Sequence, residues 1–119
     1  MDYATLSGFE KDFTRLEKRF RSLKEDFEKL KKFSIELYHE QSIDNRGIVK
    51  VEGWCGENYT TFKIRKFACR ALRCGANSGL RVIYVHQPML NKITFIEIYF
   101  KADQENETRN RIKEFLKTL

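Results

Sequence analysis

The chain has 119 residues, of which 41% are hydrophobic, enough for one domain with one packed core. Proline occurs once, glycine six times and aromatic residues make up 13%, a composition that excludes low-complexity disorder. No run of about 18 apolar residues occurs, which excludes a membrane-spanning helix. The N-terminal segment carries acids and no apolar stretch, unlike a secretory signal. We therefore expect a single cytoplasmic domain over residues 1–119.

The net charge of +6 is unevenly placed along the chain. The stretch 58–96 has no acidic residue, whereas the rest of the chain is close to neutral. Its basic residues are Lys63, Arg65, Lys66, Arg70, Arg73, Arg81 and Lys92. Such a segment favours binding to a polyanion such as nucleic acid. An ordinary solvated basic surface is the alternative.

The first third of the chain predicts an edge strand followed by two helices. The strand covers residues 3–6, and apolar residues then recur at helical spacing over 9–30. We predict a helix over 8–20, a tight turn, and a second helix over 22–38, folded as a hairpin that covers one face of a sheet. One continuous coiled-coil helix is the alternative.

Two Ser-x-x-Glu patterns support the division into two helices. Ser7 with Glu10 has the form of a capping box, in which each side chain bonds a backbone N–H at a helix start. Ser22 with Glu25 repeats the pattern inside the apolar stretch. The second box predicts a new helix start at that point.

The rest of the chain predicts strands and one further helix. We expect strands over 48–51, 60–67, 80–85 and 92–99, turns over 53–58 and 75–79, a short connection over 87–91, and a helix over 104–118. The predicted fold is therefore α+β, a small antiparallel sheet packed on an N-terminal helical hairpin, with a C-terminal helix.

Strand alternation predicts a cationic surface. If Phe62 and Ile64 pack under the helices, Lys63 and its neighbour two residues on emerge from the opposite, uncovered face. Two further cations stand at strand ends, so we expect four to converge: Lys63, Arg65, Arg81 and Lys101. Tyr84 or Tyr99 nearby would stack on an unpaired base. Alternatively, Tyr99 belongs to the core.

The cysteines and histidines do not predict a metal site. Cys55, Cys69 and Cys74 lack the spacing of zinc ligands, and only His39 and His86 could join them. We expect free thiols that pack as small hydrophobic groups, and no metal.

Four segments resemble, in the expected order, motifs of RelE-type toxins from prokaryotic toxin–antitoxin pairs of the RelE/ParE superfamily. The segments are 16–26 (the helical hairpin), 62–65 (a Tyr-Lys-Ile-Arg strand), 75–84 (a Gly-rich turn and Arg-Val-Ile strand) and 98–103 (an Ile-Tyr-x-Lys segment). The resemblance spans most of the chain. It departs at the turn, where Asn77 or Ala76 replaces a family lysine and Leu80 replaces the second glycine.

The resemblance implies a small basic ribonuclease that cuts messenger RNA, commonly on the ribosome, and a cognate antitoxin that masks its basic face. It places Lys63, Arg65, Arg81 and Lys101 in the family's cationic site, to which we add Tyr99. The predicted RNA contacts around that site are Lys66, Arg70, Arg73, Asn77 and Tyr84.

Cleavage by the RNA 2′-hydroxyl needs a base, charge stabilisation at the phosphate and an acid, but no metal or cofactor. Neighbouring cations favour the neutral form of a lysine, so Lys63 is the predicted base, and Lys101 or Tyr99 the acid. The two arginines would clamp the phosphate. His86 is a further acid–base candidate, and Glu97 is expected to be a structural hydrogen-bond partner.

Three other functions remain open from the sequence. The altered turn favours a RelE-fold protein that binds RNA, the ribosome or an antitoxin without cleaving. A gyrase inhibitor of ParE type would share the fold. A coiled-coil interaction protein would need the continuous helix.

Overall fold

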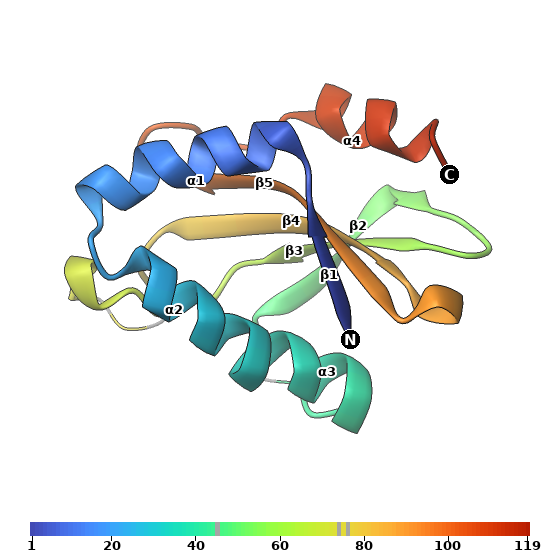
Figure 1. Ribbon diagram of the computed structural model, residues 1–119, viewed down its shortest axis with the longest axis horizontal. Helices are drawn as coiled ribbons and strands as arrows, with labels where there is room; N and C mark the ends of the chain where they lie inside the picture. Colours follow the sequence, from blue (N-terminus) through green and yellow to red (C-terminus); the bar gives the residue numbers. More distant parts are fainter. Residues whose placement is uncertain (45, 74, 76) are drawn as a thin grey trace.

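The computed structural model describes residues 1–44, 46–73, 75 and 77–119 (Figure 1). The strands are β1 (Asp2–Thr5), β2 (Ile48–Cys55), β3 (Thr60–Ile64), β4 (Leu80–Gln87) and β5 (Lys92–Phe100). The helices are α1 (Ser7–Arg19), α2 (Leu23–Leu30), α3 (Glu36–Gln41) and α4 (Arg109–Leu116), with a π-helical turn (Lys31–Ile35) joining α2 to α3. The predicted α+β class is confirmed. Within the described residues, no helix is long and apolar enough to cross a membrane.

The five strands form one mixed sheet in the order β1-β5-β4-β3-β2. The pairs from β2 to β5 are antiparallel, but β1 lies parallel to β5. The prediction of a wholly antiparallel sheet was therefore wrong at this edge. Hairpin connections impose antiparallel pairing on neighbouring strands, whereas β1 and β5 are joined only through the rest of the domain, which leaves their direction free.

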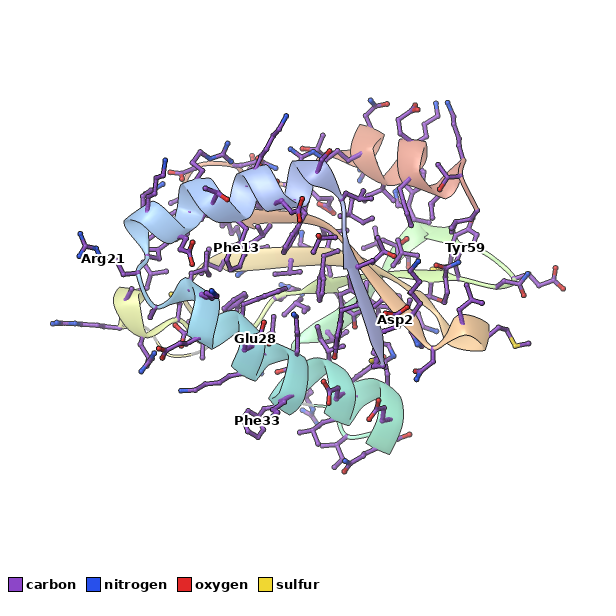
Figure 2. All side chains as sticks on the ribbon, in the orientation of Figure 1. Asp2, Phe13, Arg21, Glu28, Phe33 and Tyr59 are labelled. Carbon is purple, nitrogen blue, oxygen red and sulfur yellow. The ribbon has the colours of Figure 1, made fainter. Side chains whose placement is uncertain are left out.

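The first two helices are separate, as predicted, which rules out the alternative of one continuous coiled-coil helix. α1 ends at Arg19 and α2 begins at Leu23. The helices meet at this turn and then diverge over the sheet, rather than pairing along their length (Figure 1). Where they approach, Phe13 of α1 (labelled in Figure 2) packs edge to face against Phe27 of α2, with ring centroids 5.3 Å apart. Their apolar sides build the main core on one face of the sheet.

Neither predicted capping box forms. Ser7 is already the first residue of α1, and Glu10 instead accepts a hydrogen bond from the Thr5 hydroxyl at 3.1 Å. The Ser22 hydroxyl accepts the backbone N–H of Ala71 at 3.0 Å. The connection between β3 and β4 packs against the start of α2, and this tertiary contact uses the hydroxyl that the local pattern assigned to a cap.

Several element boundaries differ from those predicted, among them those of β2, β3 and α4. β2 continues through Gly53, whose φ of 85° a glycine adopts without strain, where a turn was expected. β3 ends at Ile64 instead of continuing to residue 67. α4 begins at Arg109, because residues 101–108 form a loop that is bonded to Glu97 of β5.

The second face of the sheet is only partly open. A β-bulge in β5 leaves Ile96 without a partner opposite, since Ile83 pairs with Glu97 and Tyr84 with Phe95. The bulge keeps Ile96 on the second face, where α4 covers a smaller core. Its buried members are Ile83, Val85, Ile96, Tyr99 and Ile112. The expectation that this face is wholly uncovered was therefore wrong.

Candidate functional site

A pocket with a volume of about 340 Å³ opens on the second face, at the end of the sheet where β3 stops and β4 starts. The lining residues are Val49, Lys63, Arg65, Arg81, Tyr99, Lys101, Glu105 and Asn106. The structure thus brings all five predicted catalytic residues into one pocket. This volume is at the small end of the range for ligand sites, about 300–1,000 Å³.

The strand register explains why these side chains meet. Arg81 of β4 lies opposite Tyr99 of β5. Lys63 of β3 lies opposite Val49 of β2, and continuing the pairing of β3 with β4 places Arg65 beside Arg81. Residues two apart on a strand share a face, so Lys63 and Arg65 point to the same side. The alternation of side chains along β3, which the sequence predicted, therefore places Lys63 and Arg65 on the pocket side of the sheet.

Tyr99 lines the pocket with an unsatisfied hydroxyl. The residue is 3% exposed, and its buried hydroxyl has no hydrogen-bond partner among the residues described. Burial raises the pKa of Tyr99 above its ordinary value, and the nearby Lys63 ammonium offsets part of this rise. The phenol is therefore protonated at neutral pH. A buried donor without an acceptor costs about 1–3 kcal/mol, which an oxygen of a bound ligand would recover.

The surroundings of Lys63 differ from those assumed in the sequence argument. Its Nζ lies 3.4 Å from Oε2 of Glu107 and 5.8 Å from the ring centroid of Tyr99. Only 19% of the Lys63 side chain and 10% of the Glu107 side chain are exposed. The predicted base is therefore held in an ion pair with Glu107, a partner that the sequence argument did not include.

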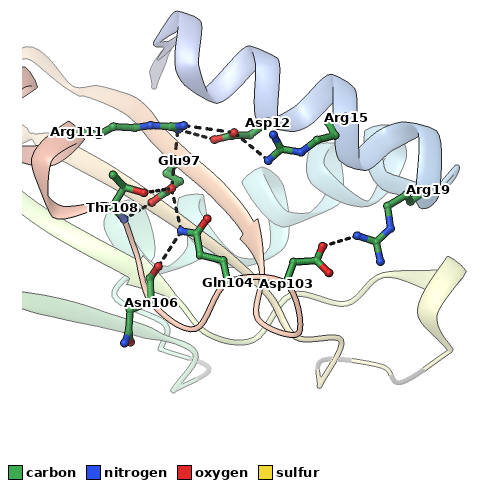
Figure 3. Close-up of polar contacts among 9 residues, drawn as sticks. All are labelled: Asp12, Arg15, Arg19, Glu97, Asp103, Gln104, Asn106, Thr108 and Arg111. Carbon is green, nitrogen blue, oxygen red and sulfur yellow. Dashed lines mark hydrogen bonds and ion pairs between the residues drawn. The ribbon is translucent and has the colours of Figure 1, made fainter.

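The loop over residues 101–108 forms one wall of the pocket, and Glu97 holds it (Figure 3). Glu97 is 2% exposed and accepts hydrogen bonds from Gln104 Nε2 at 3.1 Å, from the Thr108 backbone N–H at 2.7 Å and from Thr108 Oγ1 at 2.7 Å. Gln104 Nε2 also donates to the backbone oxygen of Asn106 at 2.7 Å. The expectation that Glu97 is a structural hydrogen-bond partner is confirmed.

Two ion pairs fasten the same region to α1 (Figure 3). Arg111 of α4 donates to both carboxylate oxygens of Asp12, at 2.5 and 3.4 Å. This hydrogen bonding is the main cause that raises the pKa of Arg111. Arg19 pairs with Asp103 in the loop itself. The wall of the pocket is thus tied both to the strand below it and to a helix beside it.

Tyr84 and His86 do not reach the pocket. Tyr84 is fully buried on the helix-covered face, where its hydroxyl shares a 2.7 Å hydrogen bond with Nε2 of His39. The His86 ring packs against that of His39 with centroids 4.0 Å apart and the ring planes tilted by 40°. Burial lowers the pKa of both histidines, that of His39 to about 4. The roles predicted for Tyr84 and His86 were wrong, since both stand an odd number of residues from Arg81 and so point to the opposite face.

The other predicted RNA contacts lie outside the pocket, in the connection between β3 and β4. Arg70 donates to Asp26 at 3.2 Å and to Glu25 at 2.5 Å, so two carboxylates of α2 neutralise it. Arg70, predicted as an RNA contact around the site, therefore lies outside the pocket with its charge already paired. Three more predicted contacts are exposed in this connection: Lys66, Arg73 and Asn77. Ala76 lies outside the described residues.

The thiols are divided between core and surface. Cys69 is 1% exposed, as expected for a thiol packed in the core. Cys55 is exposed, so the prediction that it packs as a small hydrophobic group was wrong. Cys74 lies outside the described residues. Within the part of the chain that the structure describes, no three His, Cys, Asp or Glu residues are placed to hold a metal ion.

Four residues at the pocket escaped the sequence reasoning: Val49, Glu105, Asn106 and Glu107. Three of them fall in the stretch that was expected to be helical from residue 104. One residue in the sequence could have indicated the later helix start: Thr108, a type favoured at the N-cap, which is its position in α4. Its hydroxyl, however, bonds to Glu97 instead of capping the helix.

Comparisons of this chain with protein-family models, curated proteins and solved structures gave no match. Its function is therefore inferred from the chemistry of the pocket.

Proposed function

We propose that this protein is an endoribonuclease that cuts messenger RNA in the pocket, as the toxin of a toxin–antitoxin pair. One observation carries the proposal: four cations line one pocket together with Tyr99, whose buried, protonated hydroxyl has no hydrogen-bond partner among the described residues. Cations bind the phosphate backbone, and a buried O–H group needs an oxygen acceptor. A phosphodiester satisfies both demands with one group. This role implies that the protein acts in the cytoplasm, cuts messenger RNA on the ribosome and is bound by an acidic antitoxin.

The phosphate would lie between Arg65 and Arg81, whose guanidinium groups suit bidentate contacts with phosphate oxygens. The Tyr99 hydroxyl would donate to a phosphate oxygen. The 2′-oxygen forms a bond to phosphorus as the bond to the 5′-oxygen breaks, which leaves a 2′,3′-cyclic phosphate and a 5′-hydroxyl. Lys63 takes the 2′-hydroxyl proton while it passes one of its own to Glu107, and Lys101 donates a proton to the leaving 5′-oxygen.

A protein that binds RNA without cutting it is the second possibility. It is favoured by the ion pair between Lys63 and Glu107, which occupies the predicted base, and by the position of His86 on the opposite face. The pocket would then hold a phosphodiester with the same cations, without a competent proton acceptor.

The test uses purified protein and an end-labelled RNA oligonucleotide in EDTA, with and without translating ribosomes. We expect a product ending in a 2′,3′-cyclic phosphate, and no cut where a 2′-deoxynucleotide replaces the cleaved residue. Arg81→Ala should lower cleavage at least tenfold. Arg21→Ala, which removes an equal charge from an exposed turn outside the pocket, should not. Arg65→Ala, at an exposed position, repeats the test if Arg81→Ala unfolds.

Each result separates the two possibilities. Binding that needs Arg81 without cleavage favours the second. Absence of both binding and cleavage, with or without ribosomes, refutes the proposal. Growth arrest on controlled expression, relieved by Arg81→Ala, would support the toxin role.

A further inference from the structure

One wall of the pocket has the wrong charge for phosphate. Glu105 lines the same pocket as four cations, yet makes no ion pair with any residue described. The side-chain amide of Asn106 beside it also has no hydrogen bond within the described chain. A carboxylate repels a phosphate group, so Glu105 does not serve to bind the backbone. Its carboxylate oxygens, which accept no hydrogen bond from any described residue, are therefore available to a different part of the ligand.

This wall is held in a fixed position. The residues on either side, Gln104 and Thr108, bond inward to Glu97, while the side chain of Asn106 points away from Glu97 (Figure 3). The backbone that carries Glu105 is therefore set before any ligand arrives. A preorganised contact spends less binding energy on ordering, so it can discriminate between ligands.

The arrangement of donors and acceptors on the RNA bases decides what a carboxylate can select. A carboxylate has two acceptor oxygens and no donor. Guanine alone offers two adjacent donors, N1–H and N2–H, on its Watson–Crick edge. Adenine and cytosine set an acceptor beside their donor, and uracil has one donor between two acceptors. Each of these would place a base lone pair against a carboxylate oxygen.

We propose that Glu105, with Asn106 beside it, forms a base subsite that selects guanine in the nucleotide whose phosphate the cations hold. Val49 adds an exposed apolar surface to the same pocket, against which a ribose or base can pack. The inference rests on the proposed RNA binding, but not on cleavage.

The test measures affinity with oligonucleotides that cannot be cut. Four 2′-deoxy-substituted tetranucleotides that differ only in one central base, G, A, C or U, are titrated at constant salt by fluorescence anisotropy. A good bidentate contact discriminates by about 1–3 kcal/mol, so the guanine ligand should bind roughly 5- to 150-fold more tightly. Glu105→Gln, which turns one acceptor into a donor, should lose this preference in favour of adenine and cytosine, each of which sets an acceptor beside its donor. Glu57→Gln removes the same charge from an exposed turn and should keep it.

The outcomes distinguish this inference from the proposed function. Equal binding of all four ligands, or a guanine preference that survives Glu105→Gln, overturns the guanine subsite and leaves RNA binding intact. Failure of every ligand to bind, when Arg81→Ala also changes nothing, refutes RNA binding and the subsite together.

Discussion

Replacing Glu97 by Gln should destabilise the whole domain, although the two side chains have the same size. Glu97 is 2% exposed and accepts three hydrogen bonds from the loop before α4. A glutamine amide nitrogen cannot accept, so at least one donor on Gln104 or Thr108 would lose its partner. Hydrogen bonds to charged groups contribute about 1.5–3 kcal/mol each. We therefore expect the free energy of unfolding to fall by about 2–3 kcal/mol, which corresponds to a fall in Tm of roughly 8–12 °C for a chain of this size.

Urea unfolding followed by circular dichroism measures this loss. The matched control is Asp103→Asn, which makes the same chemical change in the ion pair with Arg19, where the two side chains are 48% and 50% exposed. Exposed ion pairs contribute about 0–1 kcal/mol, so the control should stay close to the wild type. If Glu97→Gln loses no more than about 0.5 kcal/mol, or no more than the control, the loop does not depend on this carboxylate.

Three further predictions concern other polar groups. Because burial lowers the pKa of His39 to about 4, the unfolded chain binds more protons below the ordinary value near 6.5. The free energy of unfolding should thus be level above that pH and fall as pH drops through this window, with His39 contributing about 1 kcal/mol at pH 5 after allowance for partial exposure. In urea titrations, His39→Phe should reduce this slope to the part that His86 contributes, because burial lowers the pKa of that histidine too. Tyr99→Phe should keep or raise the free energy of unfolding, since it deletes a donor that has no partner among the described residues, while RNA affinity falls. Tyr84→Phe, which loses the hydrogen bond to His39, should instead lower the free energy of unfolding by about 1 kcal/mol. The reverse ranking would contradict both assignments. Glu107→Gln frees Lys63 and should strengthen RNA binding while slowing cleavage at least tenfold; cleavage at the wild-type rate would exclude Glu107 as proton acceptor.

The strand pattern was enough to predict the cationic half of the pocket. Alternation in β3 places Phe62 and Ile64 in the core and turns Lys63 and Arg65 to the other face. This works because a strand has a period of two residues regardless of its partners. The same rule, applied consistently, would have rejected Tyr84, which is three residues from Arg81.

The remaining half of the pocket depends on tertiary contacts. The residues from 104 to 108 suit a helix, but Gln104 and Thr108 gain more from the buried carboxylate of Glu97 than a helical turn would give them. Ser22 likewise bonds to Ala71 in place of its own helix. In each case a group distant in sequence competes with a local pattern, and nothing in the local pattern reveals the competitor.

β5 carries two buried polar side chains, Glu97 and Tyr99, whose hydrogen bonding differs. The carboxylate of Glu97 is fully bonded and fixes the wall, whereas the Tyr99 hydroxyl, two residues along, has no partner among the residues that the structure describes. Buried polar groups are nearly always paired, and exceptions concentrate where a ligand completes them. The two groups should therefore respond differently to RNA. Glu97→Gln should weaken discrimination between bases, because it loosens the segment that carries Glu105, yet retain phosphate affinity. Tyr99→Phe should weaken binding of all four bases alike.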